Sequence, residues 1–118
     1  MIKTHASDQG IEYKGTIYPL VFTLNVMEEI QEEYGTIEKW GDLTDHSKGE
    51  INAKALKFGI TSMLNEGVDI WNEDHADKRE PFTPKQIGRL IMELGVEDMA
   101  KKMNQAVIDG VIDETKNA

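Results

Sequence analysis

Residues 83–95 have the sequence TPKQIGRLIMELG, which contains the strongest local signals in the chain. Thr83 can cap a helix, Pro84 suits the first helical position, and Gln86 can complete a capping box. Gly95 then supplies a C-terminal stop. Between these signals, apolar side chains recur at the i, i+3, i+4, i+7 spacing of one helix face; they are Ile87, Leu90, Ile91 and Leu94. The stretch therefore predicts an amphipathic helix.

Similar signals divide the rest of the chain into short elements. Apolar and polar residues alternate on both sides of Lys14-Gly15, which predicts a β-hairpin that Pro19 should end. The first expected elements are a hairpin over residues 11–18, a helix from Thr23 to Gly35, and a short helix capped by Thr36 with Ile37 and Trp40 on one face. A loop over 42–49, a long helix over about 51–71 and a polar loop over 72–82 are expected next. The helix after Thr83 is followed by a last helix that begins near residue 96 and fades near Gly110. The predicted fold is mainly α, with a small N-terminal β-hairpin followed by four or five helices.

We expect one domain, because 118 residues are enough for a single hydrophobic core. The predicted organisation is a flexible N-terminus over 1–10, a single helical domain with its hairpin over 11–112, and a polar tail over 113–118. Gly59 and Gly67 lie inside the long helix, where each costs about 1 kcal/mol relative to alanine. Two explanations stay open: the glycines permit close helix contact, or Gly67 ends the helix early.

Composition narrows the classes of function. The formal net charge is −9, which repels nucleic acid phosphates and anionic lipid surfaces and favours solubility. The chain contains no cysteine, so disulfides and thiol nucleophiles are excluded, and a reducing cytosol is the expected setting. No stretch has the length and apolar character of a signal peptide or a membrane helix. We therefore expect no membrane and no nucleic acid among its partners.

No pattern indicates catalysis, a cofactor or a metal ion. The three histidines lie far apart in polar stretches. The segment EDHAD over 73–77 has metal-ligand chemistry but no second histidine nearby, so a solvated loop is expected. Glu28 and Glu32 are spaced i, i+4 and are expected on an exposed helix face. No nucleophile elbow and no phosphate-binding glycine loop occurs, and the expected catalytic, cofactor and metal residues are none.

The two predicted helices after Pro84 also suggest an alternative, a helix-turn-helix. The second helix offers Lys101, Lys102 and Asn104 for contact with DNA, but acidic residues offset them. A plain helical hairpin suits the net charge better. The alternative function is thus a small acidic regulatory protein, either a helix-turn-helix module or a decoy that mimics nucleic acid.

Methionine is frequent for a chain of this size, with six residues. Its flexible side chain fills core gaps and also builds adaptable binding surfaces. Most of these residues are expected in the core, but a leftover apolar stripe would bind a partner helix. The candidate partner-binding residues are Met99 and Met103, on the part of the last helix expected to be exposed, with Trp71 nearby.

One combination of motifs resembles a known family. After the predicted hairpin come YPLVFT over 18–23 and an acidic helix that closes in EEYG over 32–35. This order resembles the opening of tail assembly chaperones from long-tailed bacteriophages of Gram-positive hosts. The later part is similar in outline, with a long helix, a charged loop, an FTP entry at 82–84 and two closing helices. The resemblance extends from about residue 11 to residue 111.

The resemblance implies a non-enzymatic function. Members of that family act in the cytoplasm of the infected host and are absent from the mature virion. They bind the tape measure protein, keep it soluble and help to recruit tail tube subunits, commonly through a frameshift-extended form. A homo-oligomer is a further expected partner, because assembly along a long client raises avidity. No catalytic residue follows from the resemblance.

Overall fold

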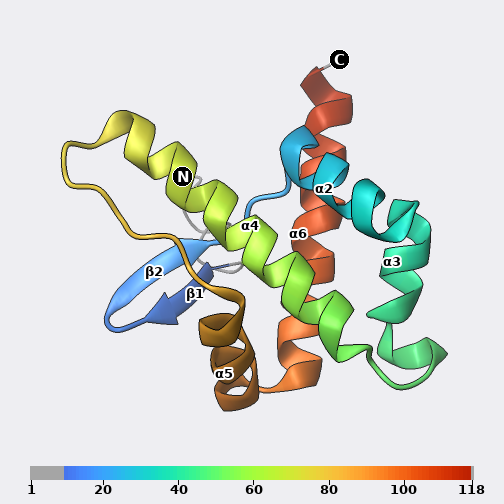
Figure 1. The fold of residues 1–118 in the computed structure, drawn as a ribbon. Helices are drawn as coiled ribbons and strands as arrows, with labels where there is room; N and C mark the ends of the chain where they lie inside the picture. The colour runs from blue at the N-terminus through green and yellow to red at the C-terminus, as the bar shows by residue number, and fades with distance from the viewer. Residues whose placement is uncertain (1–9, 118) are drawn as a thin grey trace.

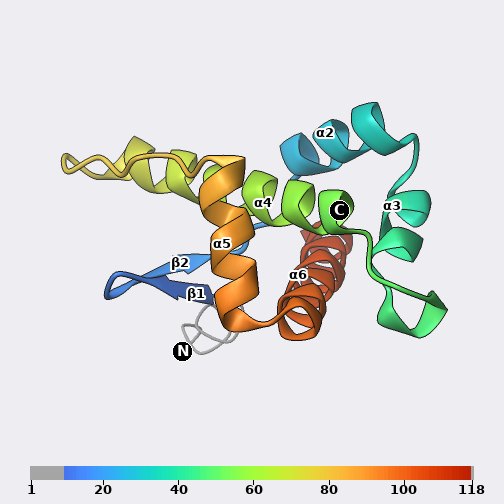
Figure 2. The same ribbon diagram turned by 60° about the horizontal axis from the view of Figure 1, so that its bottom comes forward.

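The computed structural model describes residues 10–117, and within them the predicted fold class is confirmed. An antiparallel hairpin precedes five α-helices (Figure 1). The elements are β1 (Gly10–Tyr13), β2 (Thr16–Pro19), α2 (Leu24–Tyr34), α3 (Ile37–Leu43), the 3-10 helix η1 (His46–Lys48), α4 (Ala53–Asp74), α5 (Pro84–Leu94) and α6 (Val96–Asn117). Helix α4 crosses the molecule, with α2 and α3 on one side and the hairpin and α5 on the other (Figures 1 and 2).

The hairpin has the predicted turn and is held against α4. Lys14 and Gly15 both have positive φ, 51° and 82°, as a tight two-residue hairpin turn requires. Ile11 faces the core, and Pro19 is the last residue of β2. A Cβ built on Gly67 would lie 3.0 Å from the Pro19 carbonyl oxygen, so this glycine lets β2 approach the helix closely. Gly67 therefore permits contact and does not end α4.

Caps fix the ends of the first two helices as predicted. The hydroxyl of Thr23 accepts from the Val26 amide, and that of Thr36 accepts from the Lys39 amide. Gly35, with φ of 92°, ends α2. On α3, Trp40 is buried and its Nε1 donates to the Ala55 carbonyl at 3.0 Å, which ties α3 to α4. The loop expected from residue 42 is shorter, because α3 continues to Leu43 and η1 follows.

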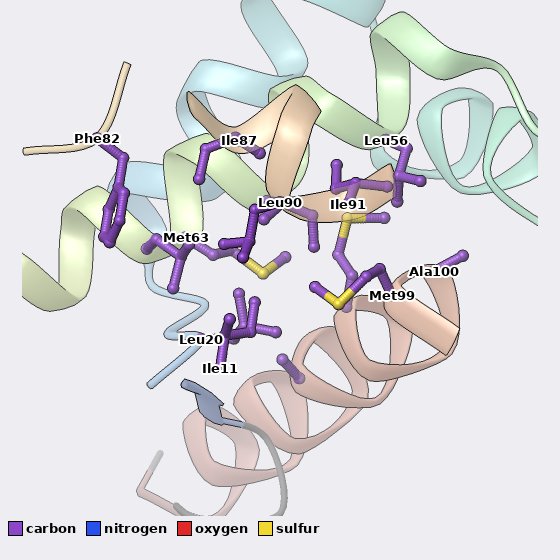
Figure 3. Packing of buried hydrophobic residues seen from close by; sticks show 14 of the residues in the cluster. Ile11, Leu20, Leu56, Met63, Phe82, Ile87, Leu90, Ile91, Met99 and Ala100 are labelled. Atoms are coloured by element: carbon purple, nitrogen blue, oxygen red, sulfur yellow. The ribbon is translucent and has the colours of Figure 1, made fainter. Parts of the chain in front are cut away.

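The core lies where α5 and α6 pack on α4. Figure 3 shows side chains from these helices and from the hairpin gathered in one cluster. Gly59 lies under Trp40 and Met103, where it leaves room for both side chains. The fully buried large side chains are Trp40, Ile30, Leu56, Ile60, Met63, Leu64, Ile87, Met99, Met103, Val26 and Val68.

The charged segment of residues 75–82, between α4 and α5, is ordered and runs along α4. We call it the strap. Asn72 of α4 accepts from the Arg79 amide at 2.8 Å and donates to the Arg79 carbonyl at 3.0 Å. Asn65 makes the same pair of bonds with Phe82, at 2.7 and 2.9 Å. Because the two asparagines are seven residues apart, they lie on one face of the helix. Helix α4 also runs to Asp74, beyond the predicted end near Trp71.

The last two helices begin as predicted, but α6 ends later. The capping box of Thr83 and Gln86 is present, and Gly95 ends α5 with φ of 108°. Helix α6 then continues to Asn117, so the prediction that it fades near Gly110 was wrong. A Cβ on Gly110 would lie 2.7 Å from the Phe22 carbonyl oxygen. The glycine thus allows α6 to pass close to the chain before α2 without a helix stop.

Candidate docking groove

An open groove of about 930 Å³ lies between the first half of α4, the outer side of α5, the start of α6 and the segment around η1. Its size is within the range of ligand and peptide sites in proteins. The lining residues are His46, Gly49, Glu50, Ile51, Ala53, Lys54, Leu56, Lys57, Gly88, Ile91, Met92, Val96 and Glu97. The elements that form it are held by the core, so the groove is part of the packed fold.

Apolar side chains form the floor and one rim of the groove. Leu56 and Ile91 are buried and contribute to the floor from α4 and α5. Met92, the next residue on α5, is 76 % exposed. This is the largest exposed fraction of any large apolar side chain among residues 10–111. Val96 at the start of α6 is also exposed. A flexible, exposed methionine beside a buried floor is suited to bind apolar side chains of varied shape.

Local hydrogen bonds hold the wall opposite α5. The Asn52 amide donates to the Leu43 carbonyl at 2.8 Å, and the Asn52 side chain caps α4 by accepting from Ala55. Asp45 caps η1 and accepts hydrogen bonds from the hydroxyl and the amide of Ser47, which lower the pKa of Asp45. The wall is therefore ordered before any partner arrives.

A contact between the side chains of His46 and Glu97 joins this wall to α6. His46 Nε2 lies 2.8 Å from a carboxylate oxygen of Glu97, and both residues line the groove. Both side chains are more than half exposed, so the pair contributes little to stability. Its effect is geometric, because it brings the η1 segment and the first turn of α6 together.

The expectation that Met99 and Met103 are exposed for a partner was wrong. Their exposed fractions are 1 % and 0 %, since they lie on the face of α6 that packs on α4 and α5. Trp71 lies at the far end of α4 and outside the groove lining. Its ring stacks on His75, with centroids 3.3 Å apart, and the guanidinium of Arg79 lies 3.6 Å from the Trp71 centroid. Trp71 therefore holds the strap.

Sequence reasoning did not select Met92. One signal was available: Met92 directly follows Ile91, so it lies outside the buried stripe of α5 while still being apolar. On a helix, an apolar residue off the core stripe is a candidate for contact with another molecule. Met92 thus replaces Met99 and Met103 as the methionine available to a partner.

Other kinds of site find little support among the described residues. No group of three or more histidine, aspartate or glutamate side chains among the described residues 10–111 is placed to hold a metal ion. No helix in that range has the length and apolar character needed to cross a membrane. Gly95 alone connects α5 to α6, whereas a helix-turn-helix uses a turn of three or four residues. Glu97 and Asp98 occupy the first turn of α6, where a recognition helix would contact DNA.

Comparison with known proteins gives no relative. No protein-family model matches the chain, and no curated protein or solved structure is significantly similar to it.

Proposed function

We propose that this protein is a tail assembly chaperone of a long-tailed bacteriophage or prophage, and that it holds an apolar helical segment of the tape measure protein in the groove between α4, α5 and α6. The observation that carries the proposal is the open apolar groove with Met92 exposed at its rim. The motifs YPLVFT, EEYG and FTP, which resemble those of the chaperone family, support the tape measure protein as the proposed client.

The groove suits a helix better than an extended strand. A helix presents apolar side chains at i, i+3, i+4 and i+7 and satisfies its own backbone hydrogen bonds. Around the groove the structure offers helices α4, α5 and α6, and neither described strand, β1 nor β2, contributes a residue to its lining. A tape measure protein is long and helical and exposes apolar stripes before the tail tube encloses it. Covering one stripe in the groove would keep that protein from aggregating.

The acidic surface serves the same function. The net charge is −9, and α2 carries exposed glutamates at 28, 29, 32 and 33. A complex covered by like charges stays soluble even when its client is long. In this proposal the protein acts in the host cytoplasm, is left out of the mature virion, and recruits tail tube subunits through a frameshift-extended form.

Co-expression with the tape measure protein tests this function. We expect the soluble yield of the tape measure protein to rise when the chain is present. Met92→Glu should abolish the increase, because it places a charge where an apolar side chain would be buried. Losing the burial of one methionine removes about 1.5–3 kcal/mol, which is roughly a 10- to 100-fold loss of affinity.

Leu24→Glu is the matched control. Leu24 is 65 % exposed on α2 and does not line the groove, so this variant adds the same charge elsewhere. It should retain full activity. An equal soluble yield with and without the wild-type chain would refute the proposed function, whereas equal losses in the two variants would refute the groove.

A further inference from the structure

Two charged side chains at the groove have no ion-pair partner among the described side chains of residues 10–111. Glu50 is exposed just before α4, and Lys57 lies on the second turn of α4. The other charged residues of the lining are paired: Glu97 contacts His46 at 2.8 Å, and Lys54 contacts Glu33 at 3.3 Å. Glu50 and Lys57 are thus available for a charged partner.

The sequence separation of Glu50 and Lys57 limits the distance between them at the groove. Three residues lead from Glu50 to the start of α4, and Lys57 follows on the helix. Extended and helical rises of about 3.3 and 1.5 Å per residue set an upper limit of roughly 16 Å on the distance between their Cα atoms. A bound helix covers distances of this order with about seven to ten residues, which is two to three turns.

The alkyl stem of Lys57 packs on α5 beside the groove. A Cβ built on Gly88 of α5 would lie 3.4 Å from Lys57 Cδ, so the alkyl stem of the lysine runs over the place where α5 lacks a side chain. Lysine commonly packs its stem on a surface while its ammonium group stays solvated. A partner that covers the groove would remove water from this ammonium group, and an acidic side chain would compensate for the loss.

We propose that the occupant of the groove is an amphipathic helix whose apolar ridge is flanked by a basic residue facing Glu50 and an acidic residue facing Lys57, two to three turns apart. This inference rests on the proposed function and specifies the client segment that the groove selects. Charge complementarity is the reason: a ridge flanked by two acidic or two basic residues meets one like charge at the groove.

Three designed helical peptides with one common apolar ridge provide the probe. At the two flanking positions the first carries Lys and Glu, the second Glu twice, and the third Lys twice. At low ionic strength, titration of each labelled peptide with the protein should show the mixed peptide binding about fivefold more tightly than either like-charged peptide. The difference should shrink at high salt, because exposed charges are then screened.

Charge reversal in the protein completes the test. Glu50→Lys should shift the preference to the peptide with two Glu residues, and Lys57→Glu should shift it to the peptide with two Lys residues. Glu50 is exposed and outside the helices, so its variant leaves the fold intact. Equal binding of all three peptides to the wild type would overturn the proposed charge preference. If Met92→Glu abolished that binding, the groove would still be the binding site. Binding of no peptide would overturn both.

Discussion

Gly59 is the position where the packing around α4 makes the sharpest prediction. Substitution by alanine adds one methyl group, which would overlap the Trp40 ring and lie 2.6 Å from Met103 Sδ. Met103 can move, but the Trp40 ring is held by its hydrogen bond to the Ala55 carbonyl. We therefore expect Gly59→Ala to destabilise the fold although alanine is the better helix former.

The expected size follows from opposing terms. Alanine gains about 1 kcal/mol over glycine in a helix interior. Overpacking a filled core costs about 1–3 kcal/mol. Displacing Trp40 from its buried acceptor adds about 1 kcal/mol. The net effect is a loss of about 1–3 kcal/mol in the free energy of unfolding.

Urea denaturation followed by circular dichroism measures this change. A loss of about 2 kcal/mol lowers the midpoint by roughly 1 M urea. Gly41→Ala is the control, because a Cβ on this helical glycine meets nothing within 4 Å, and it should leave stability unchanged or raise it by up to about 1 kcal/mol. If Gly59→Ala were as stable as Gly41→Ala, the close packing of α3 and α6 on α4 would be refuted.

Three further substitutions test other parts of the fold. Asn72→Ala removes both hydrogen bonds to Arg79 and should lower the free energy of unfolding by about 1–3 kcal/mol. Trypsin should then cleave faster after Arg79. An unchanged cleavage rate would show that other contacts hold the strap. Thr83→Ala removes the cap of α5 and should cost about 1 kcal/mol in a urea titration. Tyr34→Phe should raise the urea midpoint, because the Tyr34 hydroxyl is buried without a hydrogen-bond partner among the described residues. The same burial raises the pKa of Tyr34. A lowered midpoint would reveal a partner for the hydroxyl.

The elements that the sequence predicts correctly are those with local chemical signals. Thr23, Thr36 and Thr83 are caps because each hydroxyl accepts a hydrogen bond from an amide three residues ahead, which is a local contact. The turn at Lys14-Gly15 is equally local. Such signals are sufficient to place most boundaries of the helices and strands.

The errors concern contacts between distant residues. Gly110 has the composition of a helix stop, yet its role depends on Phe22, which lies 88 positions earlier. The strap of residues 75–82 depends on asparagines of α4 that pair with backbone groups after the helix. A polar, charged segment carries no local sign of such pairing.

The same limit explains the predicted contact residues. The sequence shows that α6 has an apolar face but does not show which helix covers it. In the structure α4 and α5 cover Met99 and Met103, whereas Met92 is 76 % exposed at the rim of the groove. A binding surface is what remains after packing, so it requires the tertiary structure.

Photo-crosslinking in the co-expressed complex tests the central claim most directly. A photoreactive amino acid is placed at position 92 in the groove or at position 24 on α2, and each variant is irradiated with the tape measure protein present. We predict a covalent adduct with the tape measure protein from position 92 and none from position 24. Adducts of equal yield from both positions, or from position 24 alone, would contradict the assignment of the groove as the client site.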